Sequence, residues 1–359
     1  MFPLFPKTIL FSIASISCAA LNLSCAHTEQ VLNKKAPQAQ KLSPIPVVYS
    51  PDYKISVFGM EKLHPFDIAK YDKIYAALKK DGIVDGTNTH DPKALTDEEL
   101  LLIHTKQYLV NLKDVSLVAR DLEAPVLKII PKKKLDKMIV TPFKKASGGT
   151  LLAARLALKN GTKMAFNLGG GYHHAKPEKG EGFCIIADVP IAIRKLQKEG
   201  LIKKALIIDT DIHQGNGTIA CLKNDPSTFT FSLHEGGIYP MPKEKGDLDI
   251  SLHAGITDQA YLQTLEKSLK DLFQKSKPDI VFHVAGCDAL AKDPLANGKM
   301  THEGIAKRDA LIVSFCKKHN VPYVMTLSGG YSKDAWNAQY KSIKNLIANE
   351  LNTANPEKH

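Results

Sequence analysis

Cysteine is scarce in this sequence, and the spacing of the cysteines does not match a disulfide framework. The 359 residues contain six cysteines, with no CxxC pair and no regular interval between them. Four of them lie among apolar or small residues. We therefore expect no disulfide scaffold.

The chain also lacks internal repeats and a concentrated basic patch. It carries 48 Lys and Arg residues against 37 Asp and Glu residues, a formal net charge of +11, which taken alone would suit nucleic acid or anionic lipid. The lysines are scattered, however, and no aromatic residue interrupts the tightest run, Lys132-Lys133-Lys134. We interpret the charge as a solvated basic surface and expect no nucleic-acid partner.

Residues 1–25 have the layout of an export signal, because Lys7 precedes a long uncharged stretch rich in Ile, Ala, Ser and Leu. The segment Leu21-Asn22-Leu23-Ser24-Cys25 resembles a bacterial lipobox, although its second residue is not aliphatic, and Cys18 is a second candidate for lipidation. Residues 26–45 are polar and end in proline-rich sequence, as a flexible tether does. We expect a lipoprotein held at a membrane outside the cytoplasm. A plain signal peptide and an uncleaved anchor remain open, and a misread segment would place the protein in the cytoplasm.

From Val47 onward, short apolar runs alternate with amphipathic segments. The predicted strands cover 46–50, 164–168, 205–208, 228–233, 280–284 and 323–327. The predicted helices lie within 66–80, 97–112, 145–160, 189–199, 259–275 and 302–318, with a last one after Ser332. This alternation predicts one α/β domain over residues 46–352, with a parallel sheet between two layers of helices.

The stretch Ala205 to Gly217, ALIIDTDIHQGNG, ends a buried strand in polar side chains. Asp209, Asp211 and His213 occupy alternate positions, so an extended backbone turns all three to the same side. Open parallel sheets bind ligands at this edge. Two carboxylates and an imidazole suit zinc or another first-row divalent metal. The alternative is a polar strand end in which one aspartate caps the next helix.

Three further polar groups follow other predicted strands. His173 and His174 come after three glycines, whose conformational freedom could turn both rings into one cavity. Asp288 ends its strand as Asp211 does and is either a third ligand or a helix cap, whereas alternation places Cys287 on the opposite side, in packing. Tyr331 follows another glycine turn and is either packing or chemistry.

Taken together, these motifs resemble the class IV histone deacetylases, within the zinc-dependent deacetylase and arginase superfamily. The resemblance covers about residues 47–346. It rests on VYSP (48–51), EKLHPFD (61–67), HTK (104–106), GGYHH (170–174), GFC (182–184), Asp209 to Gly217 and SGGY (328–331). The family implies an eight-stranded parallel sheet in the arginase/deacetylase fold, with a narrow tunnel that leads to one zinc ion.

The resemblance also implies a role for each matched residue. Zinc would be held by Asp211, His213 and Asp288. His174 would be the general base and later the acid, and His173, oriented by Asp209, would assist it. Tyr331 would donate a hydrogen bond to the developing oxyanion, which is typically worth about 3 kcal/mol. Substrate binding would fall to Gly182 and Phe183. Family members often also hold a structural potassium ion, here through Asp209, Asp211, His213, Ser232 and Leu233.

One position departs from the class I pattern. Asn216 stands where that pattern has an aspartate behind the second histidine, as in class IV. An amide stabilises an imidazolium less than a carboxylate does, so His174 should be the weaker base. We expect poor turnover of simple acetyl-lysine and better use of longer acyl chains, as the class suggests.

The sequence thus predicts a zinc-dependent hydrolase that removes an acyl group from an amine such as acyl-lysine or an acylpolyamine. An arginase-like binuclear hydrolase would need another aspartate two residues after Asp288, where this chain has Leu290. A protein that binds acylated ligands without turnover is a third hypothesis, which the complete water-activating set disfavours. Outside the cytoplasm the substrates would be acylated polyamines, amino sugars, peptides or envelope lipids.

Overall fold

The computed structural model describes residues 45–353 of the chain, and the structural statements below concern these residues. The predicted export signal, Cys18, Cys25 and nearly all of the predicted tether lie outside them.

Eight strands form one sheet, and every pair of neighbours runs parallel. In the order in which they lie side by side, the strands are β2 (Thr89–His90), β1 (Val47–Val48), β3 (Met164–Asn167), β8 (Tyr323–Thr326), β7 (Ile280–Val284), β4 (Ala205–Asp209), β5 (Thr228–Glu235) and β6 (Leu248–Leu252). The prediction of an eight-stranded parallel sheet flanked by helices is confirmed.

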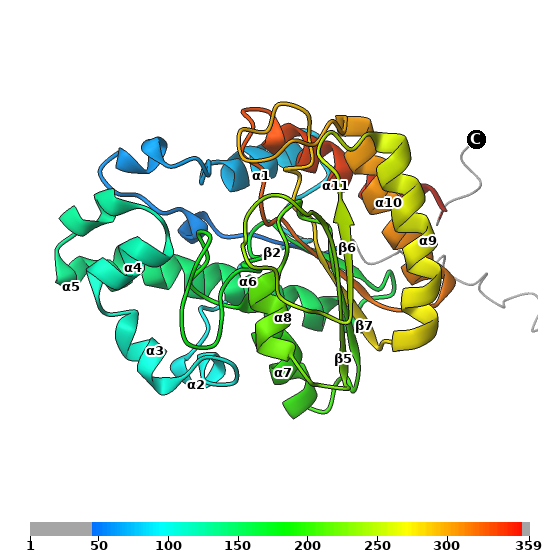
Figure 1. The fold of residues 1–359 in the computed structure, drawn as a ribbon. Coiled ribbons are helices and arrows are strands. Elements are labelled where there is room, and N and C mark those ends of the chain that lie inside the picture. The colour runs from blue at the N-terminus through cyan, green and yellow to red at the C-terminus, as the bar shows by residue number, and fades with distance from the viewer. Residues whose placement is uncertain (1–44, 354–359) are drawn as a thin grey trace, which may run out of the picture. The chain divides into compact units, whose positions relative to one another are not determined.

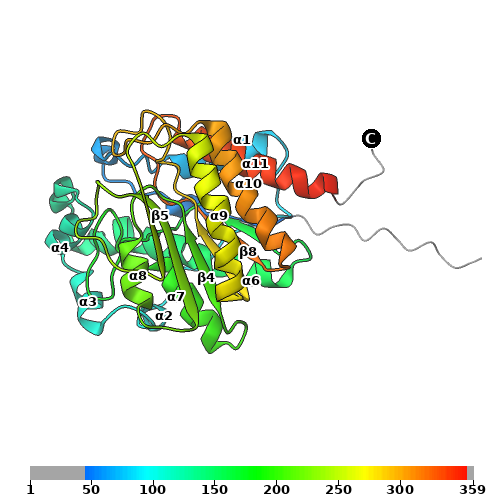
Figure 2. The ribbon, with the colours of Figure 1, turned by 45° about the vertical axis from the view of Figure 1, so that its right-hand side comes forward.

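Helices pack on both faces of the sheet (Figures 1 and 2). One layer contains α1 (Lys70–Lys80), α9 (Asp258–Ser276), α10 (His302–Lys318) and α11 (Ala335–Thr353). The side chains of the other layer come from α2 (Asp97–Leu100), α3 (Lys106–Asn111), α4 (Val115–Asp121), α5 (Lys132–Leu135), α6 (Thr141–Lys159), α7 (Asp188–Lys198) and α8 (Asn216–Leu222). Short helical turns lie at η1 (Pro51–Tyr53), η2 (Met60–Leu63), η3 (Pro125–Ile129) and η4 (Asp136–Val140).

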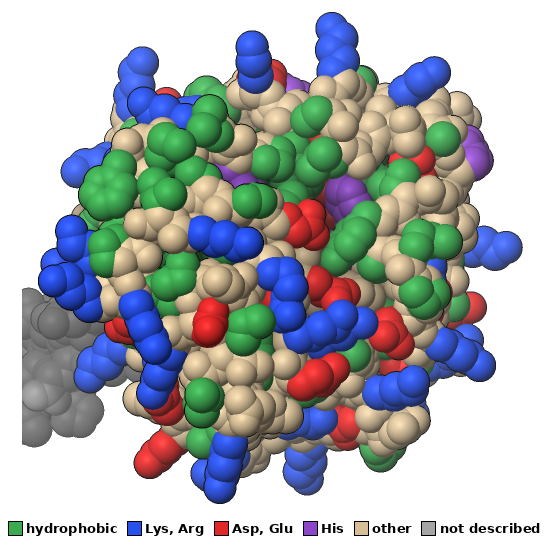
Figure 3. All heavy atoms as spheres, turned by 60° about the vertical axis from the view of Figure 1, so that its left-hand side comes forward, with side chains coloured by type: hydrophobic (Ala, Val, Ile, Leu, Met, Phe, Trp, Pro, Cys, Tyr) green, Lys and Arg blue, Asp and Glu red, His purple; other side chains and the backbone are tan. Residues whose placement is uncertain are grey.

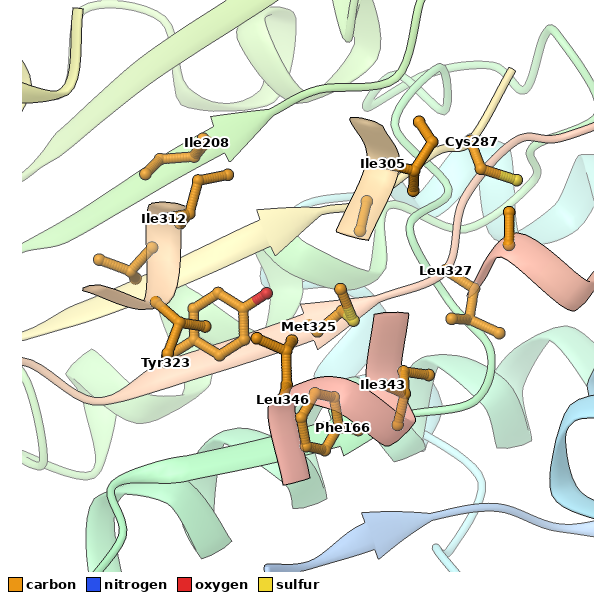
Figure 4. Packing of buried hydrophobic residues seen from close by; sticks show 14 of the residues in the cluster. Phe166, Ile208, Cys287, Ile305, Ile312, Tyr323, Met325, Leu327, Ile343 and Leu346 are labelled. Carbon is orange, nitrogen blue, oxygen red and sulfur yellow. The ribbon is translucent and has the colours of Figure 1, made fainter. Parts of the chain in front are cut away.

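Alternation along the strands divides the core into these two layers. In β4, Leu206 and Ile208 belong to the hydrophobic cluster under α9, α10 and α11, whereas Ala205 and Ile207 belong to the cluster under α6 and α7. Figure 4 shows side chains of α10 and α11 packed against β8. Because both faces of the central strands are buried, their functional side chains emerge only where the strands end.

Several predicted element boundaries were wrong. Strands β2 and β6 were not predicted, and β1 is two residues long instead of five. The helix expected from Phe66 begins at Lys70, and the region 97–112 divides into α2 and α3.

The helix predicted within 145–160 begins at Thr141, so Gly148 and Gly149 lie inside α6. Their role is close packing. A Cβ atom on Gly148 would lie 1.9 Å from Lys93 O, and one on Gly149 would lie 2.1 Å from the Tyr53 hydroxyl.

Candidate metal centre and active site

Asp211, His213 and Asp288 form one buried cluster at the carboxyl edge of the sheet. The first two follow β4 and the third follows β7, and these strands are neighbours that pair Asp209 with Val284. Each of the three residues offers a ligand atom within 4.8 Å of the others. The predicted convergence of these side chains is therefore confirmed.

Hydrogen bonds fix the orientation of all three side chains. The Asp211 carboxylate accepts from the Ser328 hydroxyl at 2.9 Å and from the Gly329 amide at 2.8 Å, and Asp288 accepts from the Ile212 amide at 2.9 Å. His213 Nε2 lies 3.3 Å from Leu295 O, to which it can donate, while its Nδ1 faces Asp288 Oδ2 at 2.9 Å. This tautomer leaves the Nδ1 lone pair directed at the space between the carboxylates, as in sites where a carbonyl orients a ligating histidine.

The two buried carboxylates give this cluster a negative charge that a bound cation would neutralise. Burial and the neighbouring Asp211 charge raise the pKa of the Asp288 carboxyl above its usual range. Burial lowers the pKa of the His213 imidazole, but the two carboxylates outweigh that effect and raise it. Two buried carboxylates and one neutral imidazole are a donor set that zinc accepts, with coordination positions left for water and substrate. The residues present therefore fit a catalytic zinc site.

The two histidines lie beside the cluster. They follow β3 through a turn in which Gly170 and Gly171 have φ angles of 69° and 77°, in the left-handed region that glycine tolerates. The ring centroids of His173 and His174 are 4.0 Å apart, and both residues line one cavity. A Cβ atom on Gly171 would lie 2.8 Å from Ser328, so glycine is also required for packing.

Different partners give the two histidines different basicities. Burial lowers the pKa of His173, but the Asp209 carboxylate, 2.8 Å from its Nδ1, and Asp211 raise it to about 9. Burial and the nearby His173 hold the pKa of His174 well below its usual range. Asn216 Oδ1 lies 2.7 Å from His174 Nδ1, and its amide donates to Glu181 Oε1 at 2.5 Å. This orientation makes Nδ1 the protonated nitrogen of a neutral His174 and leaves Nε2 free to accept a proton.

Tyr331 and Phe183 face each other across the site. The Tyr331 ring centroid lies 5.9 Å from that of Phe183 and 6.0 Å from that of His213. Burial and the Asp211 carboxylate raise the pKa of the Tyr331 phenol well above its usual range, so it stays a hydrogen-bond donor. A Cβ atom on Gly182 would lie 2.5 Å from the His174 ring, which explains the glycine before Phe183.

These residues help to line a cavity of about 100 Å³. His173, His174 and Tyr331 form part of its wall. The rest of the lining is mainly apolar and includes Ile55, Val57, Leu127, Ile139 and Phe143.

Comparison with known proteins decides the family. The model of the histone deacetylase domain matches residues 64–347. The chain belongs to the histone deacetylase family.

Two relatives agree with this assignment, and one solved structure shares the fold. The chain is 35% identical to histone deacetylase 2 of Arabidopsis thaliana over 332 residues, 92% of this chain and 85% of that protein. It is 31% identical to the acetoin utilization protein AcuC of Bacillus subtilis over 266 residues, 70% of this chain and 67% of that one. The crystal structure of the HDA15 HD domain has the same fold, with a TM-score of 0.70 at 21% identity over 86% of this chain and 93% of that one.

This deacetylase-family protein is accordingly a hydrolase with an Asp-His-Asp metal site, and the buried set is consistent with the zinc site of the family. Leu290, at the position where a binuclear site would need a carboxylate, packs in the hydrophobic core. Within residues 45–353, no helix has both the length and the apolar character needed to span a bilayer. The four described cysteines are free, and the Cys287 thiol contacts Ala335 O at 3.5 Å in the core.

The predicted potassium ligands also lie together. Ser232 pairs with Asp209 in the register of β4 and β5, and the Ser232 hydroxyl is 3.0 Å from His234 Nδ1. Asp209 accepts from the Asp211 amide at 3.1 Å. Potassium binding here stays a prediction.

Three residues of the site had not been predicted from the sequence. Lys70 is buried, and its ammonium donates to Ser328 O at 2.6 Å and Gly329 O at 3.2 Å. Asp293 accepts from the Tyr331 amide at 2.8 Å and from the Leu295 amide at 3.0 Å. The Tyr239 ring lies 5.0 Å from that of His174. The only sequence signal for Lys70 was its place within four residues of the EKLHPFD motif.

Proposed function

We propose that this protein is a zinc-dependent hydrolase of the class IV type that cleaves the amide bond of an acylated amine. The observation that carries the proposal is the buried Asp211, His213 and Asp288 set next to His174, whose Nε2 is free to accept a proton, at the end of an apolar cavity.

Zinc held by the three ligands would supply a Lewis acid that polarises the amide carbonyl and lowers the pKa of the attacking water. His174 takes a proton from that water at Nε2 and later delivers it to the leaving amine. His173, paired with Asp209 at 2.8 Å, holds positive charge beside the reacting centre. The Tyr331 hydroxyl donates to the carbonyl oxygen as negative charge develops there.

Class membership is supported by Asn216 and by the shape of the cavity. Because Asn216 presents a neutral oxygen to His174 Nδ1, it stabilises the protonated ring less than a carboxylate would. The mainly apolar walls of the cavity suit a hydrocarbon chain better than they suit water. We therefore infer that the preferred acyl groups are longer than acetyl, on amines such as acyl-lysine or acylpolyamines.

For the cellular location, we propose an exported lipoprotein attached through Cys25, supported by the sequence of residues 1–25. Labelling cells with a fatty-acid probe tests this. The wild-type protein should incorporate label and the Cys25→Ala variant should not. Equal labelling of the two proteins would refute attachment at Cys25.

An activity screen tests the hydrolase. The zinc-loaded protein is offered amines that carry acyl chains from acetyl to palmitoyl, with free amine as the readout. We expect longer chains to be cleaved faster than acetyl, and His174→Ala and Asp211→Ala to lose at least 100-fold in rate, on the order of the effect of removing a general base. Tight binding of a hydroxamate with no hydrolysis of any substrate would instead support the acyl-ligand binding protein. Acetyl-lysine turnover as fast as in class I enzymes would refute the class IV proposal.

A further inference from the structure

Exposed apolar side chains gather around the catalytic cavity. Phe58 and Leu63 are 65% and 73% exposed and lie in the segment 55–64, which contributes Ile55, Val57, Met60, Glu61 and His64 to the lining of the cavity. Ile129 is 57% exposed and follows the cavity residues Val126 and Leu127. Large exposed apolar groups placed together on one face mark an interaction site more often than scattered ones do.

A second part of the chain brings an exposed apolar side chain close to the same site. Met241 is 70% exposed, and it lies two residues after Tyr239, whose ring packs against those of His174 and His213. We call Phe58, Leu63, Ile129 and Met241, together with Lys128 and Lys132–Lys134, the docking face.

Lysines accompany the apolar side chains. Lys128 and the run Lys132–Lys134 are exposed, and the Lys134 ammonium lies 5.7 Å from the centre of the Phe58 ring. The acidic Glu61 on the neighbouring segment is turned to the chain's own backbone, where it accepts from the Val57 and Gly59 amides at 2.8 and 3.0 Å. Figure 3, which brings this side of the molecule forward, shows hydrophobic groups with Lys and Arg side chains around them and a histidine near the centre of the view.

We propose that the docking face binds the surface of an anionic lipid bilayer, so that the catalytic cavity opens toward the membrane. The apolar side chains would enter the boundary between headgroups and acyl chains, and the lysines would contact lipid phosphates. The proposal deepens the proposed acyl-amine hydrolase and rests on it for one consequence, that the substrate is an acylated amine reached from the bilayer.

The chemistry favours lipid over the two other occupants of such a face. Nucleic acid would pair with the lysines but would leave Leu63, Ile129 and Met241 against a polar backbone. A second copy docked through the same face would bring two lysine-bearing surfaces together, and their like charges repel.

Tryptophan scanning tests docking on the full chain. The variant Trp336→Phe removes the only native tryptophan. In this background, Phe58→Trp introduces a single tryptophan on the docking face. The matched control is Leu201→Trp, because Leu201 is an exposed apolar residue that precedes β4 at the opposite edge of the sheet, near Lys198, Lys203 and Lys204. Attachment through the N-terminal segment would act on both proteins equally.

Vesicles of phosphatidylcholine and phosphatidylglycerol with brominated acyl chains should quench the tryptophan at 58 and shift its emission to the blue, and should leave the tryptophan at 201 unchanged. Reversing the three lysines, Lys132→Glu/Lys133→Glu/Lys134→Glu, should raise the lipid concentration for half-maximal quenching at least about 100-fold, since each lysine near an anionic surface contributes about fivefold. Lys198→Glu/Lys203→Glu/Lys204→Glu should change it by less than about threefold, because those lysines lie far from the bilayer.

Equal quenching at 58 and 201, or none at either, would overturn the docking proposal. A blue shift of the tryptophan at 58 that appears only when the protein dimerises in sedimentation would overturn it too. Hydrolysis of a soluble acylated amine is measured on the same samples. Hydrolysis without quenching would refute docking and leave the proposed function standing, whereas quenching without any hydrolysis would refute the proposed function and leave docking standing.

Discussion

The substitution Gly329→Ala would perturb the metal centre directly, because it adds a methyl group next to two of the predicted ligands. A Cβ atom built on Gly329 would lie 2.5 Å from Asp211 Oδ2 and 2.6 Å from Asp288 Oδ2. Carbon and oxygen atoms ordinarily approach to about 3.3 Å. Each of the two carboxylate oxygens must therefore move about 0.8 Å away from the new methyl group, or the backbone must shift. The methyl group would thus enter the space between two of the three ligands.

The effect on zinc should exceed the effect on folding. Zinc–ligand distances tolerate deviations of about 0.2 Å, and loss of a supporting group alone costs about 10- to 100-fold in affinity. With two ligands displaced, we expect zinc affinity to fall at least about 100-fold, or about 2.7 kcal/mol. The metal-free protein should lose about 1–3 kcal/mol, as is usual when one methyl group is forced into a packed interior.

Competition with a chromophoric chelator measures zinc affinity, and thermal unfolding of the metal-free protein measures the cost to the fold. Gly237→Ala is the matched control, because nothing lies within 4 Å of a Cβ atom there and the residue follows β5 at the same carboxyl edge of the sheet. Zinc affinity of Gly329→Ala within about tenfold of wild type would refute the assignment of Asp211 and Asp288 to one ion.

Three other predictions follow from single side chains. Tyr331→Phe should lower kcat by about 100-fold or more while chelator competition shows unchanged zinc affinity; an unchanged kcat would remove the phenol from the reaction. Asn216→Asp should raise the pKa of His174 by adding a carboxylate at its Nδ1, so the acid limb of the kcat/KM profile should move to higher pH; an unmoved limb would contradict His174 as the base. Burial lowers the pKa of His104 to about 4 from a usual 6.5. Because the unfolded chain then binds a proton that the folded chain does not, stability should fall by about 2 kcal/mol between pH 7 and pH 5. His104→Gln, which keeps an acceptor for the Ala187 amide, should flatten this dependence in denaturant titrations, and an equal slope would show that His104 is not its source.

Six of the eight strands and the metal ligands could be predicted from local pattern, whereas the count of eight strands came from the family resemblance. Asp211 and His213 follow a buried strand at alternate positions, and Asp288 follows another. Parallel strands deliver their carboxyl ends to one edge of the sheet, which allows convergence, and the pairing of β4 with β7 places Asp288 beside Asp211. The glycine turn before His173 was likewise visible, because only glycine adopts left-handed backbone freely.

What escaped prediction depends on contacts between distant segments. Lys70 is a lysine on an amphipathic helix, and its burial against Ser328 O follows from the packing of α1 beside α11. Asp293 lies in an irregular loop, where no periodicity indicates that it will bind the Tyr331 amide. No local signal showed that Lys93 O would lie 1.9 Å from a Cβ atom on Gly148, inside α6. Such contacts are set by tertiary structure and leave no local signal.

An anomalous difference map at the zinc absorption edge, from crystals of the zinc-loaded protein, shows directly whether Asp211, His213 and Asp288 hold one zinc ion. We predict one strong peak per chain, about 2.0–2.2 Å from His213 Nδ1 and from a carboxylate oxygen of both Asp211 and Asp288. A map with no peak among these three residues, or with the zinc bound by other side chains, would contradict it.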